Sequence, residues 1–512
     1  MITEDQSRVV AFLSAPSTHA GAVVERIDTH ASFVFLVGDR AWKLKRAVRY
    51  DYLDYSTADR RRAMCQAEVR VNRRTAPHLY RGVVAVTQQA DGTLVIGGSG
   101  APVDWLVEMA RFDQAGLFDR LAAAGVLDLH LMQPLADAVA RFHAGAEYRM
   151  DQGGPAAMAR VIDGNAAGFA AEGAGLFDPV RCARLINRTR YALDLAYVRI
   201  DSRREDGWVR QCHGDLHLRN IVLIDGQPML FDAIEFNEEL ACIDVLYDLA
   251  FLLMDMWRRG LPHHANVVWN GYLADTMDFD GLALMPLFLS CRAAVRAKTS
   301  ATAANLQAAG DRRSELRALA CDYLAMAEAL LEPPPPCLVA VGGPSGSGKS
   351  TLATALAPSL GAVPGAVVIR SDEIRKKLRH VKPFDPLGPE GYTTEVSQQV
   401  YAATLERADS VIRSGHAAII DAVFARTEDR NAARYVAAAA GVPFVGLWLD
   451  APEPVLIARV EGRGPDVSDA DADVIRRQLA QQTDVAQWTR VDASGARQRV
   501  LDEVHKIVRD GQ

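Results

Sequence analysis

The sequence predicts two domains of different fold class: an α+β domain with two lobes, and then an α/β domain built on a parallel sheet. The chain has 512 residues, more than one hydrophobic core supports, because cores stop growing at roughly 250–300 residues. Four consecutive prolines, Pro333 to Pro336, cannot continue a helix and favour an extended connector. Regular alternation of strands and helices begins only after them. We therefore assign residues 1–332 to the first domain, 333–336 to a linker and 337–512 to the second domain.

Composition limits the kind of partner and compartment. The formal net charge is −7, which argues against broad nucleic-acid binding, since that needs a basic surface. The seven cysteines include no Cys-x-x-Cys pair, so we expect neither a disulfide framework nor a zinc site, and a reducing cytoplasm fits. We expect no signal peptide and no membrane span, because no long apolar run occurs.

The first domain opens with strand patterns and continues as helix. Two strands are expected at 32–37 and 40–45, joined at Gly38-Asp39, followed by a charged helix at 59–75 and strands at 83–86, 94–96 and 105–109. From about residue 114 the sequence is Ala-rich and helical. A small sheet followed by a larger helical region predicts the two-lobed layout.

The most informative segment of this domain is His213-Gly-Asp-Leu-His-Leu-Arg-Asn220. Asp215 and Asn220 are five residues apart, the gap that separates the base from a metal ligand in the catalytic loop of protein kinases. An apolar strand then ends at Asp232. Phosphoryl transfer needs such a set, because one carboxylate accepts the proton of the attacking hydroxyl while an amide and a second carboxylate hold Mg²⁺.

The segment resembles the aminoglycoside phosphotransferase and choline kinase group, whose members carry H-G-D-x-H-x-x-N followed by an aspartate. The resemblance implies a bilobal, protein-kinase-like fold that uses ATP and Mg²⁺. It implies that Asp215 is the catalytic base and that Asn220 and Asp232 bind Mg²⁺. His213 and His217 would brace the loop, and Asp248, which matches a D-L-A segment of the family, would anchor it.

A lysine must also reach the nucleotide. Lys43 and Lys45 share one face of the second strand, because side chains alternate with period two. The spacing from an upstream alanine favours Lys43, whereas the strand-ending Leu-Lys of the family favours Lys45, which we prefer narrowly. Glu68 is the expected partner of either lysine. Glu108 and Met109 stand where a kinase hinge would present backbone groups to adenine.

The second domain begins with a phosphate-binding motif. Strands are expected at 338–342, 366–370, 416–421 and 443–449, in alternation with helices. After the first strand, the sequence fits G-x-x-x-x-G-K-[S/T] and opens a helix, which predicts a P-loop NTPase. Backbone N–H groups would hold the phosphates, Lys349 would reach them, and Ser350 would ligate Mg²⁺. We assign ATP binding to Gly343, Pro344, Ser345, Gly346, Ser347, Gly348, Lys349, Ser350 and Thr351.

The residues that follow resemble the small P-loop kinases, including polynucleotide kinase, gluconate kinase and zeta-toxin-type kinases. This resemblance implies that Asp372, after the second strand, is the catalytic base and that Arg375 contacts substrate or phosphate. Asp421, at the end of the third strand, is expected near Mg²⁺. Arg459 and Arg463 match the R-x-x-x-R lid of such kinases, whose arginines clamp the transferring phosphate.

Together these features predict an ATP- and Mg²⁺-dependent phosphotransferase with two kinase centres, each acting on a hydroxyl of a small molecule. The domain order resembles fused bacterial proteins of aminoglycoside phosphotransferase and ATP-binding domains. Two alternatives stay open: a nucleotide-sensing regulator with one or both sites non-catalytic, and a second domain that acts on a nucleic-acid 5′ end or a nucleotide sugar. The sequence disfavours nucleic acid through its charge and identifies neither acceptor nor oligomeric state.

Overall fold

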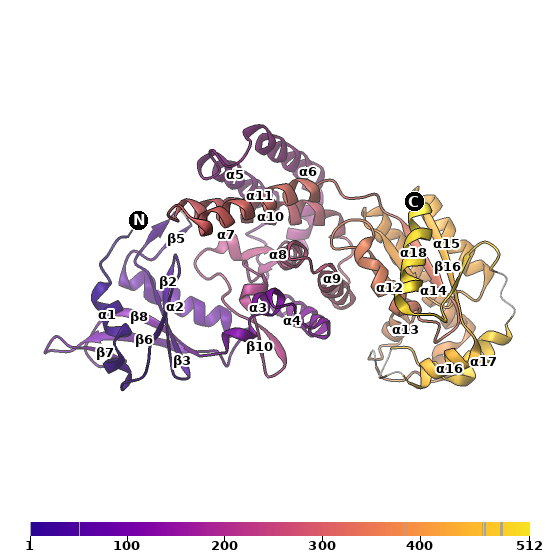
Figure 1. Cartoon of the computed structure of the whole chain (residues 1–512), viewed down its shortest axis with the longest axis horizontal. Coiled ribbons are helices and arrows are strands. Elements are labelled where there is room, and N and C mark those ends of the chain that lie inside the picture. The colour runs from indigo at the N-terminus through magenta and orange to yellow at the C-terminus, as the bar shows by residue number, and fades with distance from the viewer. Residues whose placement is uncertain are drawn as a thin grey trace. The chain divides into compact units, whose positions relative to one another are not determined.

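The computed structural model describes residues 2–50, 52–382, 384–462, 464, 467–481 and 485–511 (Figure 1). The chain forms two compact units. The first consists of Met1–Ala167 with Arg190–Asp255, and the second of Gly168–Thr189 with Met256–Gln512. The boundaries between the two compact units therefore fall within helices and not at the four prolines. The boundary at 333–336 stays a prediction about the sequence domains.

Within the described residues, a six-stranded antiparallel sheet begins the first unit, with strand order β1-β2-β3-β8-β6-β7. The strands are β1 (Glu25–Asp28), β2 (Ser32–Val37), β3 (Arg40–Lys45), β6 (Tyr80–Gln88), β7 (Leu94–Ile96) and β8 (Ala101–Ala110). The bounds of β2 and β3 are those expected from the sequence. Along β3, Trp42 and Leu44 pack with helix α1 (Ser7–Ser14), whereas Ala41 packs on the side of α2 (Ala58–Asn72). Lys43 and Lys45 share the α2 side, because side chains alternate.

Short strands and helices make the second lobe of this unit. They include α3 (Phe118–Ala123), α4 (Met132–Ala144), β9 (Val209–Gln211), β10 (Ile221–Ile224), β11 (Gln227–Leu230), α7 (Glu238–Ala241) and β12 (Cys242–Asp244). A short antiparallel pair, β4 (Arg49–Tyr50) with β5 (Leu53–Asp54), joins β3 to α2. β9 pairs with β12, and β10 pairs with β11. Residues 212–220 therefore run between two short sheets. Helices α5 (Gly154–Ala171), α6 (Pro179–Glu205) and α8 (Val245–Arg258) belong partly to each unit.

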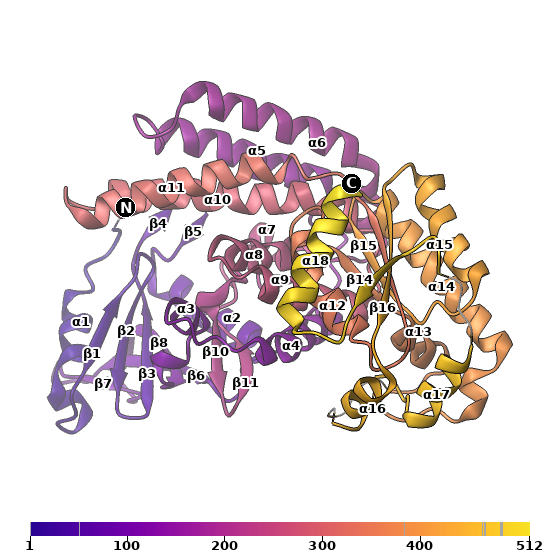
Figure 2. The ribbon, with the colours of Figure 1, turned by 45° about the vertical axis from the view of Figure 1, so that its right-hand side comes forward.

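The second unit contains a five-stranded parallel sheet of order β14-β15-β13-β16-β17. Its strands are β13 (Leu338–Gly342), β14 (Val367–Arg370), β15 (Ala418–Asp421), β16 (Phe444–Asp450) and β17 (Thr489–Asp492), of which only β17 is not predicted from the sequence. Figure 2 shows α12 (Lys349–Leu356) and α18 (Arg497–Asp510) on one side and α14 (Thr394–Arg413) and α15 (Thr427–Ala440) on the other. The predicted fold class is confirmed: an α+β kinase-like fold, then an α/β P-loop fold. Both faces of the parallel sheet are covered, so β13 is buried throughout.

Three further helices belong to the second unit although they precede the prolines: α9 (Pro262–Thr276), α10 (Met285–Asn305) and α11 (Asp311–Leu330). α9 lies against the outer edge of β14, where the Val368 N–H donates to Asn270 Oδ1 over 2.7 Å. In the described part of the chain, no helix combines the length and the apolar character that crossing a membrane requires.

The contact between α9 and β14 leads to a first prediction. If a protease site is placed in the 333–336 linker of the full chain and cut, the two halves should stay associated, because α9 covers a strand edge that would otherwise be open. Size-exclusion chromatography with light scattering measures this directly. An Asn266→Ala/Asn270→Ala chain, cut in the same way, is the control and should separate at lower dilution. Free separation of the wild-type halves at micromolar concentration would contradict the prediction.

Candidate active sites

Asp248 fixes the loop that carries Asp215. The Asp248 carboxylate is fully buried and accepts the N–H groups of His213 and Gly214, each over 2.9 Å. Gly214 has a φ of +80°, and a Cβ there would lie 2.7 Å from the Leu240 carbonyl oxygen, so only glycine fits this turn. The expectation that Asp248 anchors the loop is confirmed.

His213 links the loop to the strand that ends before Asp232. Its Nε2 donates to the Phe231 carbonyl oxygen over 2.9 Å, and its Nδ1 accepts the Asp215 N–H over 3.3 Å. Burial lowers the pKa of His213 against the opposing charges of Asp248 and Asp215, so the ring is neutral with its proton on Nε2. His213 is the brace expected from the motif.

Asp215 and Asn220 lie together, as their spacing predicts. The Asn220 side-chain amide donates to the Asp215 carboxylate over 3.0 Å and to the Asp215 backbone oxygen over 2.9 Å. His217 Nε2 lies 3.3 Å from the same carboxylate. The amide nitrogen of Asn220 thus faces Asp215, and its carbonyl oxygen is the atom chemically suited to a metal.

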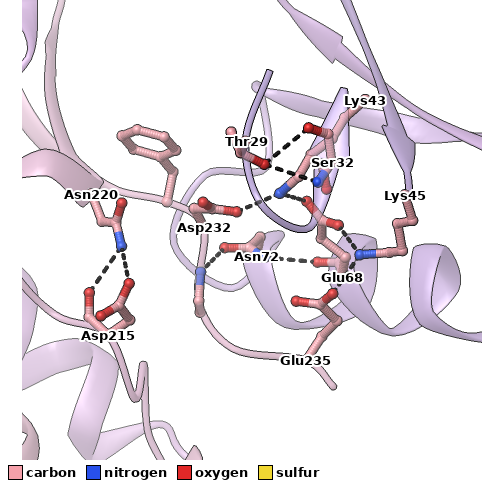
Figure 3. Close-up of polar contacts among 12 residues, drawn as sticks. Thr29, Ser32, Lys43, Lys45, Glu68, Asn72, Asp215, Asn220, Asp232 and Glu235 are labelled. Carbon is pink, nitrogen blue, oxygen red and sulfur yellow. Dashed lines mark hydrogen bonds and ion pairs between the residues drawn. The ribbon is translucent and has the colours of Figure 1, made fainter. Parts of the chain in front are cut away.

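Two lysines and three carboxylates form an ion-pair network between β3, α2 and the segment after β11 (Figure 3). Lys43 Nζ lies 2.8 Å from Glu68 Oε1 and 2.6 Å from Asp232 Oδ1. Lys45 Nζ lies 2.6 Å from Glu68 Oε2 and also bonds Glu235. The side chain of Lys43 is 15% exposed and that of Lys45 1%. Glu68 partners both lysines, and Lys43 is the one that meets Asp232.

The carboxylates of this ion-pair network raise the pKa values of both lysines. Burial lowers the pKa of Lys43, but Asp232 and Glu68 outweigh it and raise the pKa well above its usual value. For Lys45, burial likewise opposes Glu235 and Glu68, and the pKa is again raised. Both lysines are therefore charged at neutral pH.

Asp232 is held in an unusual backbone conformation. Its φ is +61°, which costs a non-glycine residue strain energy. The Asp232 N–H donates to the Tyr80 hydroxyl over 3.1 Å, and the next N–H, of Ala233, donates to Asn72 over 2.8 Å. Asn72 in turn donates to the Glu68 backbone oxygen over 3.0 Å. These contacts fix the carboxylate, 43% exposed, relative to helix α2.

His30 lies near the first candidate centre and is not predicted from the sequence. His30, in the turn between β1 and β2, interacts electrostatically with Asp215, Asp232 and Lys43, while burial lowers its pKa. The turn lacks the glycines of a phosphate loop, so no sequence motif marks His30. Glu108 and Met109 lie inside β8 with strand partners in β3 and β6, so their assignment to adenine stays a prediction.

In the second unit, the P-loop follows β13 as expected. Gly343 has a φ of +135°, and a Cβ there would lie 2.4 Å from the Leu449 carbonyl oxygen. Gly348, at φ +91°, caps the N-terminus of α12. Lys349 and Ser350 then open the helix, so its unpaired N–H groups and dipole are directed toward the loop.

Ser350, Asp421 and Arg370 meet at the ends of neighbouring strands. Ser350 Oγ donates to Asp421 Oδ2 over 2.6 Å. Arg370 donates to Ser350 Oγ over 3.2 Å, and its Nε lies 3.4 Å from Asp421 Oδ2. Lys349 Nζ donates to the Pro344 carbonyl oxygen over 3.0 Å. Arg370 is not predicted from the sequence, although it ends the second strand two residues before Asp372.

Asp372 and Arg375 begin α13 (Ser371–Leu378). Burial and the nearby Asp421 raise the pKa of Asp372, while Lys349, Arg370 and Arg375 oppose the rise. The Arg375 guanidinium lies 4.9 Å from the centre of the Tyr392 ring and donates to the Gly391 carbonyl oxygen over 2.8 Å.

The predicted lid is only partly described. Arg459, on α16 (Glu453–Glu461), donates to the Ala493 carbonyl oxygen over 2.8 Å, and its role in clamping phosphate stays a prediction. Arg463 lies outside the described residues. Asp469, which the sequence does not single out, accepts from Lys376 over 2.9 Å and from the Tyr392 hydroxyl over 2.8 Å. The lid segment is therefore tied to α13.

Comparisons with known proteins give one family match and several similar solved structures. A family model described as AAA domain matches residues 338–488, the P-loop part. Among solved structures, a choline/ethanolamine kinase family protein from Mesorhizobium loti is 13% identical, with a TM-score of 0.37, and covers 64% of this chain and 95% of its own. A sugar kinase from Janibacter sp. is 21% identical, with a TM-score of 0.28, and covers 34% and 95%. Both TM-scores are too low to establish a common fold by themselves.

One relative matches over nearly the whole of this chain and has a higher sequence identity. The uncharacterized protein Rv2004c of Mycobacterium tuberculosis is 30% identical over 493 residues, which is 94% of this chain and 95% of the relative. The match therefore spans the kinase-like and the P-loop parts together, in the same order. The chain belongs to the family of this mycobacterial protein.

Proposed function

We propose that the chain is an ATP-dependent phosphotransferase with two kinase centres, each transferring the γ-phosphate of ATP to a hydroxyl group of a small molecule. One observation carries the proposal. In each centre, a carboxylate suited to Mg²⁺ already engages the group expected to face phosphate or metal: Asp232 meets Lys43 over 2.6 Å, and Asp421 meets Ser350 over 2.6 Å. Phosphoryl transfer depends mainly on positioning and charge of this kind.

In the first centre, the residues fit a magnesium nucleotide. Bound Mg-ATP would supply the phosphoryl group with its charge partly neutralised. The oxygens of Asn220 and Asp232 are suitable Mg²⁺ ligands. Lys43 would hold the phosphates, because it meets Asp232, while the buried Lys45 would position Glu68. Asp215, whose side chain is 39% exposed, would accept the proton of the acceptor hydroxyl.

In the second centre, Lys349 and the P-loop N–H groups would bind the phosphates, and Ser350 and Asp421 would hold Mg²⁺. Asp372 would accept the proton of the acceptor, because it follows the carboxyl end of β14, where ligands bind in parallel sheets.

A reducing cytoplasm remains our proposed compartment. It is supported by the absence of any disulfide among the seven cysteines, all of them described residues.

The two lysines of the first centre should differ in their effects. In a Lys349→Ala background that weakens the second ATP site, Lys43→Ala should weaken Mg-ATP binding tenfold or more, about 1.4 kcal/mol. Lys45→Met should instead lower stability by about 3–5 kcal/mol, because it leaves buried carboxylates unpaired. Nucleotide titration and thermal unfolding measure the two effects. A larger loss of ATP affinity in folded Lys45→Met than in Lys43→Ala would reverse the assignment.

The two proposed bases can be tested separately. Asp215→Asn should silence the first centre and Asp372→Asn the second, each lowering transfer by roughly 10²–10⁴, the usual contribution of a positioned base. ATP affinity should stay within about threefold. The measurement is γ-phosphate transfer to a metabolite library by both single variants and the double variant. If neither centre of the wild type transfers to any acceptor or to water, the chain is a nucleotide sensor instead.

The second centre should also show a displaced pH profile. A general base works only when ionised, so activity falls as the pH drops through its pKa. Because burial and Asp421 raise the pKa of Asp372 and Arg375 lowers it, the acid limb should lie above the usual aspartate range. Arg375→Met should move it to still higher pH. The profile of kcat/KM in an Asp215→Asn background measures the shift, and a limb that moves to lower pH would contradict the assignment.

A further inference from the structure

Among the residues that the structure describes, side chains of α9 bond the outer edge of β14, and no other strand pairs with that edge. β14 is the first strand in the sheet order, with β15 on its inner side. On the outer side, the Val368 N–H donates to Asn270 Oδ1 over 2.7 Å, and Asn270 Nδ2 donates to the Ala366 carbonyl oxygen over 3.3 Å. Asn266, one turn earlier on the helix, donates to the carbonyl oxygens of Pro364 and Ala366, each over 3.1 Å. Two side-chain amides thus make hydrogen bonds that the backbone of a neighbouring strand would otherwise make.

The backbone is shaped to receive these amides. Gly365 has a φ of +108°, and a Cβ there would lie 2.5 Å from the Ala357 carbonyl oxygen and 2.9 Å from Asn266 Nδ2. Only glycine therefore lets the chain pass between them. Asn266 is 1% exposed, so its amide has no access to water as an alternative partner, and its bonds to the segment that leads into β14 cannot be lost without cost.

Two further contacts reach β15 and α13, one from the short helix Leu282–Leu284 that follows α9 and one from α9 itself. His416, two residues before β15, bonds the Leu282 carbonyl oxygen through Nε2 over 3.0 Å. Burial lowers the pKa of His416 to about 4, so the ring is neutral and Nε2 is the donor. Lys377 of α13 bonds the Ala274 carbonyl oxygen, near the C-terminal end of α9, where a cation is favoured.

We propose that α9 is a working part of the second kinase centre and that Asn270 is a positioning residue for Arg370 and Asp372. Val368, which Asn270 holds, precedes Arg370 by two residues and Asp372 by four. Arg370 contacts Ser350 and Asp421, so a shift of β14 along or across the sheet moves both the metal-side arginine and the base. The inference rests on the proposed function of this centre.

ATP binding and transfer should respond differently to a change in α9. The P-loop follows β13, which β15 separates from β14. Loss of the Asn270 bonds should therefore misplace Asp372 while it leaves the phosphate-binding loop in place. A small misplacement of a reacting group is enough to lower turnover strongly. General unfolding would instead remove ATP binding and turnover in equal proportion.

The test uses the full chain in an Asp215→Asn background, with Asn270→Ala as the variant. His263→Ala, an exposed position on the same helix, is the matched control. Three quantities are measured: hydrogen exchange of the peptide 366–372, Mg-ATP affinity, and phosphate release from ATP to water or to any acceptor found by screening. For Asn270→Ala we expect faster exchange, affinity within about threefold of the parent and turnover lowered roughly tenfold or more. Asn270→Asp keeps the acceptor for the Val368 N–H and should retain more turnover.

Unchanged exchange in Asn270→Ala would show that α9 does not hold β14. Faster exchange with unchanged turnover, or equal losses of affinity and turnover, would overturn the positioning role while the proposed function stands. Absence of turnover in the parent chain, toward water and every acceptor, would contradict the proposed function and the positioning role together. An effect of His263→Ala equal to that of Asn270→Ala would also count against the inference.

Discussion

The buried carboxylate of Glu68 is the constraint on which the first centre depends. Its side chain has no exposure to solvent, and an isolated charge in that position would cost many kcal/mol. The lysines of β3 supply the compensating charges, one to each carboxylate oxygen. Because Lys43 and Lys45 then reach Asp232 and Glu235, the same requirement draws the segment after β11 toward the sheet. The position of the candidate metal ligand follows from the neutralisation of a helix glutamate.

The second centre meets its electrostatic requirement through topology. In a parallel sheet, all strands end at one edge, so Arg370 from β14 and Asp421 from β15 arrive side by side. Ser350 reaches them because the P-loop follows the carboxyl end of β13, at the same edge of the sheet. Three residues that are far apart in sequence thus meet because the strands that carry or precede them end at the same edge of the sheet.

The sequence predicts what is local and misses what depends on packing. The loop from His213 to Asn220 and the P-loop are contiguous, so their folds and neighbours follow from short-range rules. The choice between Lys43 and Lys45 cannot be made in this way, since both share a strand face and only the contact with Asp232 separates them. Arg370 and Asp469 carry no motif of their own, because their contacts come from other elements. Asn266 and Asn270 are ordinary helix residues until β14 lies beside them.

The prolines separate the two sequence domains, but the boundary between the compact units lies earlier, within α8. The consecutive helices α8 and α9 explain this difference. α8 carries Asp248, which holds the N–H groups of His213 and Gly214. α9, which follows it in the chain, carries the asparagine that holds β14. Each candidate centre therefore depends on an anchor that lies outside its own motif and before the linker. A helical region that anchors a loop in one centre and a strand in the other is under more constraint than one that serves a single site. A change in either helix acts on residues that belong to neither sequence motif.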